Sequence, residues 1–161
     1  MVFLSICPIL FGLSKANYLK KRQKTIEKLI ELLNYIIAEI RYKKTDILTL
    51  IMNLSLKESF KKLEFLQNLK NKIKLKPFPI AWASSINESN LSIDKDDENL
   101  LKSVSNILGA YDSKDQIVAL KHINSQFKES LKNAKENYLS KGKIAKSLGI
   151  LIAIAIVIIL I

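Results

Sequence analysis

Few side chains in this chain could carry out chemistry. His122 is the only histidine and Cys7 the only cysteine, so neither can complete a zinc site or form a nucleophile and base pair at a recognisable spacing. Asp112 and Asp115 are close enough for acid–base work, but their place after Gly109 is the place of a helix cap. We expect no catalytic, metal or cofactor site, and therefore no enzyme.

Nucleotide phosphates and metallohydrolase chemistry have no visible site either, because the chain lacks G-x-G-x-x-G, P-loop and H-E-x-x-H motifs. The chain carries 26 Lys and Arg against 15 Asp and Glu, a formal charge of +11, which predicts an anionic partner. Lysines concentrate at Lys20–Lys24 and Lys57–Lys76, without the interleaved aromatics that stack bases, so nucleic acid is not expected. Lipid headgroups explain the first run, while the second is either a solvated face or a docking surface for an acidic protein.

Both ends of the sequence are apolar. Ser147–Ile161 has no charge and follows Lys141, Lys143 and Lys146; counted from Ile144, a helix of this segment rises about 27 Å against roughly 30 Å of hydrocarbon. Val2–Leu13 repeats the pattern more weakly and precedes its lysines, unlike a cleaved signal peptide. We predict an N-terminal membrane anchor at 1–19, with interfacial burial or a short core helix as alternatives, and a transmembrane helix at 144–161, with a buried core helix as the alternative.

Lysines that flank both apolar segments on their inner sides place the intervening residues 20–143 on the cytoplasmic side of a membrane. Four Gly and three Pro leave few tight turns, so one all-α domain is expected. Apolar spacing and capping residues predict helices near 26–40, 47–54, 57–74, 80–90, 94–108 and 112–138. The predicted fold is a bundle of about six helices flanked by N- and C-terminal membrane segments.

Four short motifs follow one another at a definite spacing. They are Glu39-Ile40-Arg41-Tyr42 with Thr45, Trp82, Leu108-Gly109 with Asp112 and Gln116, and Lys146-Ser147-Leu148-Gly149. In their order and spacing the chain resembles the stage III sporulation protein AB family of endospore-forming bacteria over essentially its full length. Asp46 departs from the proline that is usual in the family, and Ala153 departs from a second glycine; both replacements suit a helix.

The resemblance implies a membrane component of the secretion-like channel that links mother cell and forespore. It implies a helical domain similar to the cytoplasmic domains of platform proteins in type II secretion and type IV pilus systems. The implied partners are the stage III AA-type ATPase and other channel components, and self-association is a further expectation. The implied location is the outer forespore membrane, with the soluble domain facing the mother-cell cytoplasm.

These expectations lead to a docking hypothesis in which lysines bind the ATPase and no residue is catalytic. The residues selected for partner binding are Lys57, Lys61, Lys62, Lys70 and Lys72, with Arg41 and Tyr42 as a weaker second choice. Two alternatives come from other classes of protein. One is a membrane-surface adaptor that binds anionic lipid or nucleic acid through its basic face, and the other is a membrane-disrupting peptide of the holin type.

Overall fold

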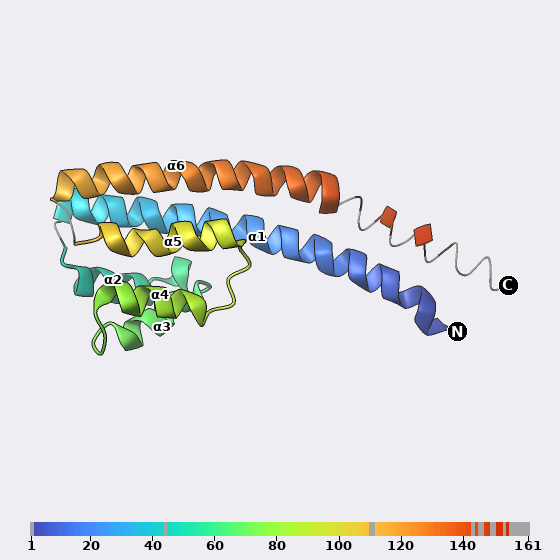
Figure 1. Cartoon of the computed structure of the whole chain (residues 1–161), viewed down its shortest axis with the longest axis horizontal. Helices are drawn as coiled ribbons and strands as arrows, with labels where there is room; N and C mark the ends of the chain where they lie inside the picture. The colour runs from blue at the N-terminus through green and yellow to red at the C-terminus, as the bar shows by residue number, and fades with distance from the viewer. Residues whose placement is uncertain are drawn as a thin grey trace. The chain divides into compact units, whose positions relative to one another are not determined.

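The computed structural model of the chain is helical throughout its regular parts (Figure 1). It describes residues 2–43, 45–109 and 112–142, and beyond them residues 144, 147, 148, 151, 152 and 154. The chain divides into two compact units. We call residues 25–130 the core unit, and residues 1–24 together with 131–161 the terminal unit.

Helix α1 is a single uninterrupted helix, Val2–Lys43, so the helix predicted near 26–40 is continuous with the first apolar segment. In the core unit it buries one face, with positions spaced by three and four residues as an amphipathic helix requires. The buried residues of this face are Ile26, Leu29, Leu32, Leu33, Ile36, Ile37 and Ile40. Leu32 belongs to this face, whereas Ile30 is only half-buried.

Helix α2, Ile47–Leu56, begins where the sequence predicts, because the Asp46 carboxylate accepts a hydrogen bond from the Thr49 backbone N–H at 3.0 Å. The single helix expected over 57–74 is wrong: a 3-10 turn, Glu58–Phe60, precedes helix α3, Glu64–Lys72.

The break lies at Leu63, whose ψ of 83° is outside the helical region. Phe60 and Leu63 are both buried at this junction. Gln67 of α3 then donates to the Ser55 carbonyl at 2.6 Å and ties α3 to the end of α2.

Helix α4, Phe78–Asn87, starts directly after Pro77, with Pro79 in its first turn, where a missing N–H costs nothing. Trp82 is fully buried, as expected, and its indole N–H donates to the Leu101 carbonyl at 2.8 Å. Phe65 and Phe78 contact the Trp82 ring at centroid distances of 5.4 and 5.6 Å. The Phe65 contact connects α3 to α4, and the hydrogen bond to Leu101 connects α4 to the next helix.

Helix α5, Lys95–Ile107, is capped by Asp94, and helix α6, Ser113–Asn137, is followed by a π-helical turn, Tyr138–Gly142. Within the core unit α6 bonds to α1, where Asn124 donates to the Asn34 side chain at 2.7 Å. It also bonds to α5, where the Ser130 hydroxyl donates to the buried Asp97 carboxylate. The short helices pack in sequence, α2 on α3, α3 on α4 and α4 on α5. An all-α bundle of six helices is therefore confirmed for the described residues.

Among the described residues, none of the helices combines the length and the apolar character that crossing a bilayer requires. The membrane anchor predicted at 1–19, which coincides with the start of α1, is therefore not supported. Most of the transmembrane helix predicted at 144–161 lies outside the described residues. The boundaries predicted at 19/20 and 143/144 remain predictions.

Candidate functional site

Two regions of the core unit contain the residues that the sequence selected for partner binding. We call residues 57–76, from the end of α2 to the loop before α4, the lysine segment. We call the end of the core unit where α1 meets α2 and α5 meets α6 the turn end. The turn end contains two of the sequence motifs, with Thr45 from the first and Gly109 from the third.

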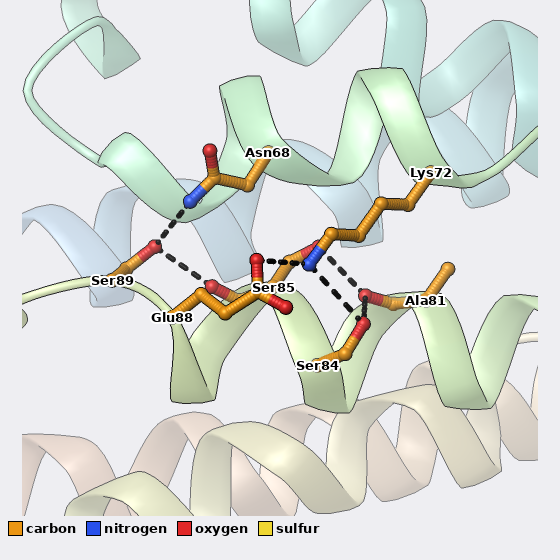
Figure 2. Close-up of polar contacts among 7 residues, drawn as sticks. All are labelled: Asn68, Lys72, Ala81, Ser84, Ser85, Glu88 and Ser89. Atoms are coloured by element: carbon orange, nitrogen blue, oxygen red, sulfur yellow. Dashed lines mark hydrogen bonds and ion pairs between the residues drawn. The ribbon is translucent and has the colours of Figure 1, made fainter.

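Lys72 is less exposed than we expected of a docking lysine. Only 19% of its side chain is exposed, and its ammonium group forms an ion pair with Glu88 of α4 at 2.5 Å and contacts the Ser84 hydroxyl at 3.5 Å (Figure 2). Figure 2 shows that this lysine reaches from α3 across to α4. Lys72 therefore connects the two helices, and two of the three donors of its ammonium group face partners inside the fold.

The polar contacts beside Lys72 are also internal to the fold (Figure 2). The Asn68 amide of α3 donates to the Ser89 hydroxyl at 3.1 Å, and Ser89 donates in turn to the Ser85 carbonyl at 2.7 Å. Ser85 is buried and donates to the Ala81 carbonyl at 2.7 Å. Because these hydroxyls bond back to their own helix, they present little free hydrogen-bonding capacity to a ligand.

The remaining selected lysines differ in how far the fold uses them. Lys57 is exposed, and its ammonium group lies 3.8 Å from the centroid of the Tyr35 ring, a cation–π contact. Lys61 is exposed and pairs with Glu58. Lys62 is exposed and Lys70 half-buried, and neither has an ion pair among the described residues. Of the five, Lys62 and Lys70 are the two for which the described part of the chain shows neither an ion pair nor a cation–π contact.

The end of the lysine segment adds residues that the sequence reasoning left out of the site. Lys74 and Lys76 are exposed and have no ion pair among the described residues. Leu75 between them is 82% exposed, and Ile80 just beyond is also exposed. In the sequence, this surface could have been recognised from an apolar residue between two lysines, directly before Pro77, which precedes α4. Exposed apolar side chains beside unpaired cations are typical of an interaction surface.

Glu39 organises the turn end from a buried position. It accepts hydrogen bonds from the Lys43 ammonium group at 2.8 Å and the Thr45 hydroxyl at 3.1 Å. The Lys43 hydrogen bond, with smaller contributions from Tyr35 and Thr45, holds the pKa of Glu39 below its ordinary value. Burial, and then the hydrogen bond to Glu39, raises the pKa of the Tyr35 hydroxyl. Glu39 and Thr45 of the first motif therefore join α1 to the start of α2.

Arg41 and Tyr42, the second choice for partner binding, both lie exposed in the last turn of α1. Tyr42 is 76% exposed, and the Arg41 guanidinium carbon lies 5.9 Å from the centroid of its ring. Neither side chain takes part in the Glu39 hydrogen bonds.

Gly109 closes the turn end in a conformation that favours glycine. Its φ is +82°, and a Cβ built there would lie 2.6 Å from Cδ1 of Ile47. After the turn, Asp112 accepts hydrogen bonds from the backbone N–H groups of Lys114 and Asp115 at 2.8 and 3.0 Å. The backbone bond from Asp115, then that from Lys114, lowers the pKa of Asp112. The capping role predicted for Asp112 is confirmed.

A half-open cavity of about 210 Å³ lies between these turns. Its walls come from the two motifs and the residues beside them, which the sequence separates by about sixty positions. They are Ile40, Thr45, Asp46, Ile47, Leu50, Leu108, Gly109, Ser113 and Gln116. The fold brings the two motifs together around this cavity, so their residues have a shared place in the structure.

The described residues contain no cluster of three or more His, Cys, Asp or Glu that could hold a metal ion. His122 is exposed on α6, with a ring nitrogen 3.3 Å from the Gln126 amide nitrogen.

Charge divides unevenly between the two units. The core unit contains sixteen Lys and Arg against fourteen Asp and Glu, a formal charge of +2, whereas the terminal unit contains ten against one, a formal charge of +9. Within the core unit, the lysine segment contains seven lysines against Glu58 and Glu64, a charge of +5. The lysine segment therefore has a larger positive charge than the core unit as a whole.

Comparison with known proteins identifies one family. The whole chain, residues 1–161, matches the family described as stage III sporulation protein AB (spore_III_AB). No curated protein and no solved structure matches the chain. Because the match covers the full length, the resemblance seen in the motifs is confirmed, and the chain belongs to the stage III sporulation protein AB family.

Proposed function

We propose that the chain is a non-enzymatic membrane platform of the secretion-like channel between mother cell and forespore, and that it docks a cytosolic ATPase of the secretion type. Family membership supports a role in stage III of sporulation. The apolar ends at 1–19 and 144–161, each followed or preceded by lysines, support attachment to a membrane. The core unit then lies in the mother-cell cytoplasm, attached to the outer forespore membrane.

The lysine segment is the proposed docking surface, and its charge is the observation that carries the proposal. The lysine segment has a net charge of +5, whereas the rest of the core unit has a net charge of −3. Lys62, Lys70, Lys74 and Lys76 keep ammonium groups without an ion pair among the described residues. An acidic protein surface would gain complementary charge there and desolvate Leu75, whereas Lys72 is excluded because Glu88 already binds it.

Arg41 and Tyr42 offer a second docking point at the turn end. Arginine and tyrosine are frequent among the residues that dominate binding energies, and both side chains are exposed here. A platform that contacts one ATPase subunit through the lysine segment and another through Arg41 and Tyr42 would also couple neighbouring copies of itself.

Charge reversal in the full chain tests the docking surface. We would co-express the chain with the stage III AA-type ATPase and compare Lys62→Glu/Lys74→Glu/Lys76→Glu with the unaltered protein. All three residues are exposed, so folding should be retained. Loss of ATPase from the purified chain is expected for this variant.

The matched control reverses three exposed lysines of the core unit on α6: Lys114→Glu/Lys121→Glu/Lys128→Glu. It changes the net charge by the same amount, so it should retain the ATPase if binding is local. If both variants retain the ATPase equally, the docking surface lies elsewhere. If both lose the ATPase equally, binding depends on the net charge of the chain and not on the lysine segment.

A further inference from the structure

The terminal unit contains almost all of the excess charge, yet the proposed docking surface does not use it. Ten Lys and Arg stand against a single acidic residue, Glu136, in residues 1–24 and 131–161. Lys15, Lys20, Lys21, Lys24 and Lys132 are exposed, and none of them has an ion pair among the described residues. We call these five residues the collar; Arg22, which is buried, is not part of it.

The lysines of the collar on α1 lie close together on the helix surface and therefore repel one another. At 3.6 residues per turn, Lys20, Lys21 and Lys24 fall within an arc of about 100° on one side of the helix. Lys20 and Lys24 are four residues apart, a spacing at which like charges destabilise a helix by a few tenths of a kcal/mol. Such an arrangement is expected where an external anionic surface compensates the repulsion.

The distance of the collar from the apolar residues fits a lipid surface. Along α1, Lys20 to Lys24 lie about 10 to 17 Å beyond Leu13, the last residue of the apolar stretch. A headgroup layer is about 5 to 8 Å thick on each side of the hydrocarbon, and the Debye length adds about 8 Å at physiological salt. Lys15 would lie among the headgroups, and the other collar lysines of α1 within reach of their potential.

Two exposed side chains of the terminal unit fit the same environment. Tyr18, between Lys15 and Lys20, is 46% exposed, and tyrosine is enriched at the level of lipid headgroups. Leu139, in the turn that follows α6, is also exposed. One aromatic among these lysines is too few for the stacked bases of a single-stranded nucleic acid, whereas it suits an interface between water and lipid.

We infer that the collar binds anionic phospholipid headgroups, so that the chain prefers a membrane surface rich in phosphatidylglycerol over a zwitterionic one. This inference rests on the membrane attachment in the proposed function and adds the class of lipid. The core unit, with its nearly balanced charge, contributes little to the preference. A basic segment gains up to about 1 kcal/mol for each lysine near an anionic surface.

Native mass spectrometry of the full chain tests the inference. The chain is released from neutral detergent micelles that contain equal amounts of phosphatidylglycerol and phosphatidylcholine, and the ratio of the two bound lipids is measured. We expect the ratio to favour phosphatidylglycerol clearly and to fall at least about tenfold in Lys20→Gln/Lys21→Gln/Lys24→Gln. Lys20→Arg/Lys21→Arg/Lys24→Arg should retain the preference.

The matched control, Lys114→Gln/Lys121→Gln/Lys128→Gln, removes the same charge from the core unit and should leave the ratio unchanged. A ratio near one for the unaltered chain, or an equal fall in the control, would overturn the inference. Displacement of the bound phosphatidylglycerol by duplex DNA at the same phosphate concentration would assign the collar to nucleic acid and overturn it as well. The platform role would survive each of these results, since co-purification of the ATPase tests it independently.

Discussion

The turn end and the lysine segment both contain residues chosen from the sequence, but the fold uses them differently. At the turn end, Glu39, Thr45 and Gly109 are fixed by hydrogen bonds or by backbone conformation. In the lysine segment, Lys62, Lys74 and Lys76 form no ion pair among the described residues. A family motif can therefore mark a position needed for folding, while a surface available for a partner lies in a region without a recognisable motif.

The strongest way to test this comparison is to remove the buried carboxylate. Glu39→Ala leaves the Lys43 and Thr45 donors and the Tyr35 hydroxyl without their shared acceptor. We expect the free energy of unfolding to fall by about 2 kcal/mol. The measurement is denaturant unfolding followed by the fluorescence of Trp82, which is the only tryptophan and is buried in the core unit. Glu31→Ala, which removes an exposed ion pair with Lys28 on the same helix, should cost under about 0.5 kcal/mol.

The dependence on pH sharpens the same prediction. Because the pKa of Glu39 is lower in the folded than in the unfolded chain, the unfolded chain binds more protons at acidic pH. The contribution of the Glu39 carboxylate to stability should be fully present above its ordinary pKa of 4.5. It should be lost as the pH falls through the pKa of Glu39 in the folded chain. The difference in stability between the unaltered chain and Glu39→Gln should shrink over that window; a constant difference would contradict the account.

A smaller loss is expected at Gly109. Gly109→Ala places a side chain at a φ of +82°, which costs about 1 to 2 kcal/mol, and moves the flexible end of the Ile47 side chain. Gly109→Asn should cost less, because asparagine tolerates the left-handed region better. Thermal unfolding of the two variants compares them directly. If Gly109→Ala is as stable as the unaltered chain, the turn can adopt another backbone conformation without cost.

Substitution of Lys72 should lower stability, as substitutions at the turn end should, because the side chain takes part in a contact between two helices. Lys72→Met removes the ion pair with Glu88 and should lower the unfolding free energy by up to about 1 kcal/mol, since 59% of the Glu88 side chain remains exposed. Lys70→Met removes a charge without an ion pair and should be nearly neutral. If both variants are equally stable, the bridge between α3 and α4 contributes nothing measurable.

The least effect on stability is expected at the exposed residue of the turn end. Tyr42→Ala should change the unfolding free energy by under about 0.5 kcal/mol, since the ring is largely in solvent. A second measurement on this variant, co-purification of the ATPase, tests whether Tyr42 takes part in docking. Loss of the ATPase in this variant, with full binding by Lys62→Glu/Lys74→Glu/Lys76→Glu, would reverse the assignment of the two regions.

Local signals explain which parts of the fold could be predicted. Asp46, Asp94 and Asp112 each accept a hydrogen bond from a backbone N–H two or three residues ahead, so they set helix starts without help from distant residues. The break before Glu64 was missed, because no proline or glycine in residues 57–64 marks the non-helical backbone of Leu63. Propensity and spacing alone favour one continuous helix there.

Sequence alone determined the all-α class, the main helices, the family and the total charge, because these depend on periodicity, capping and composition. Tertiary structure decided which charges are available. Lys72 is neutralised by a carboxylate on the next helix, Glu39 is buried beside donors from two elements, and the +11 divides into +9 and +2. Each of these outcomes depends on contacts or groupings between residues distant in the chain, and no local pattern encodes them.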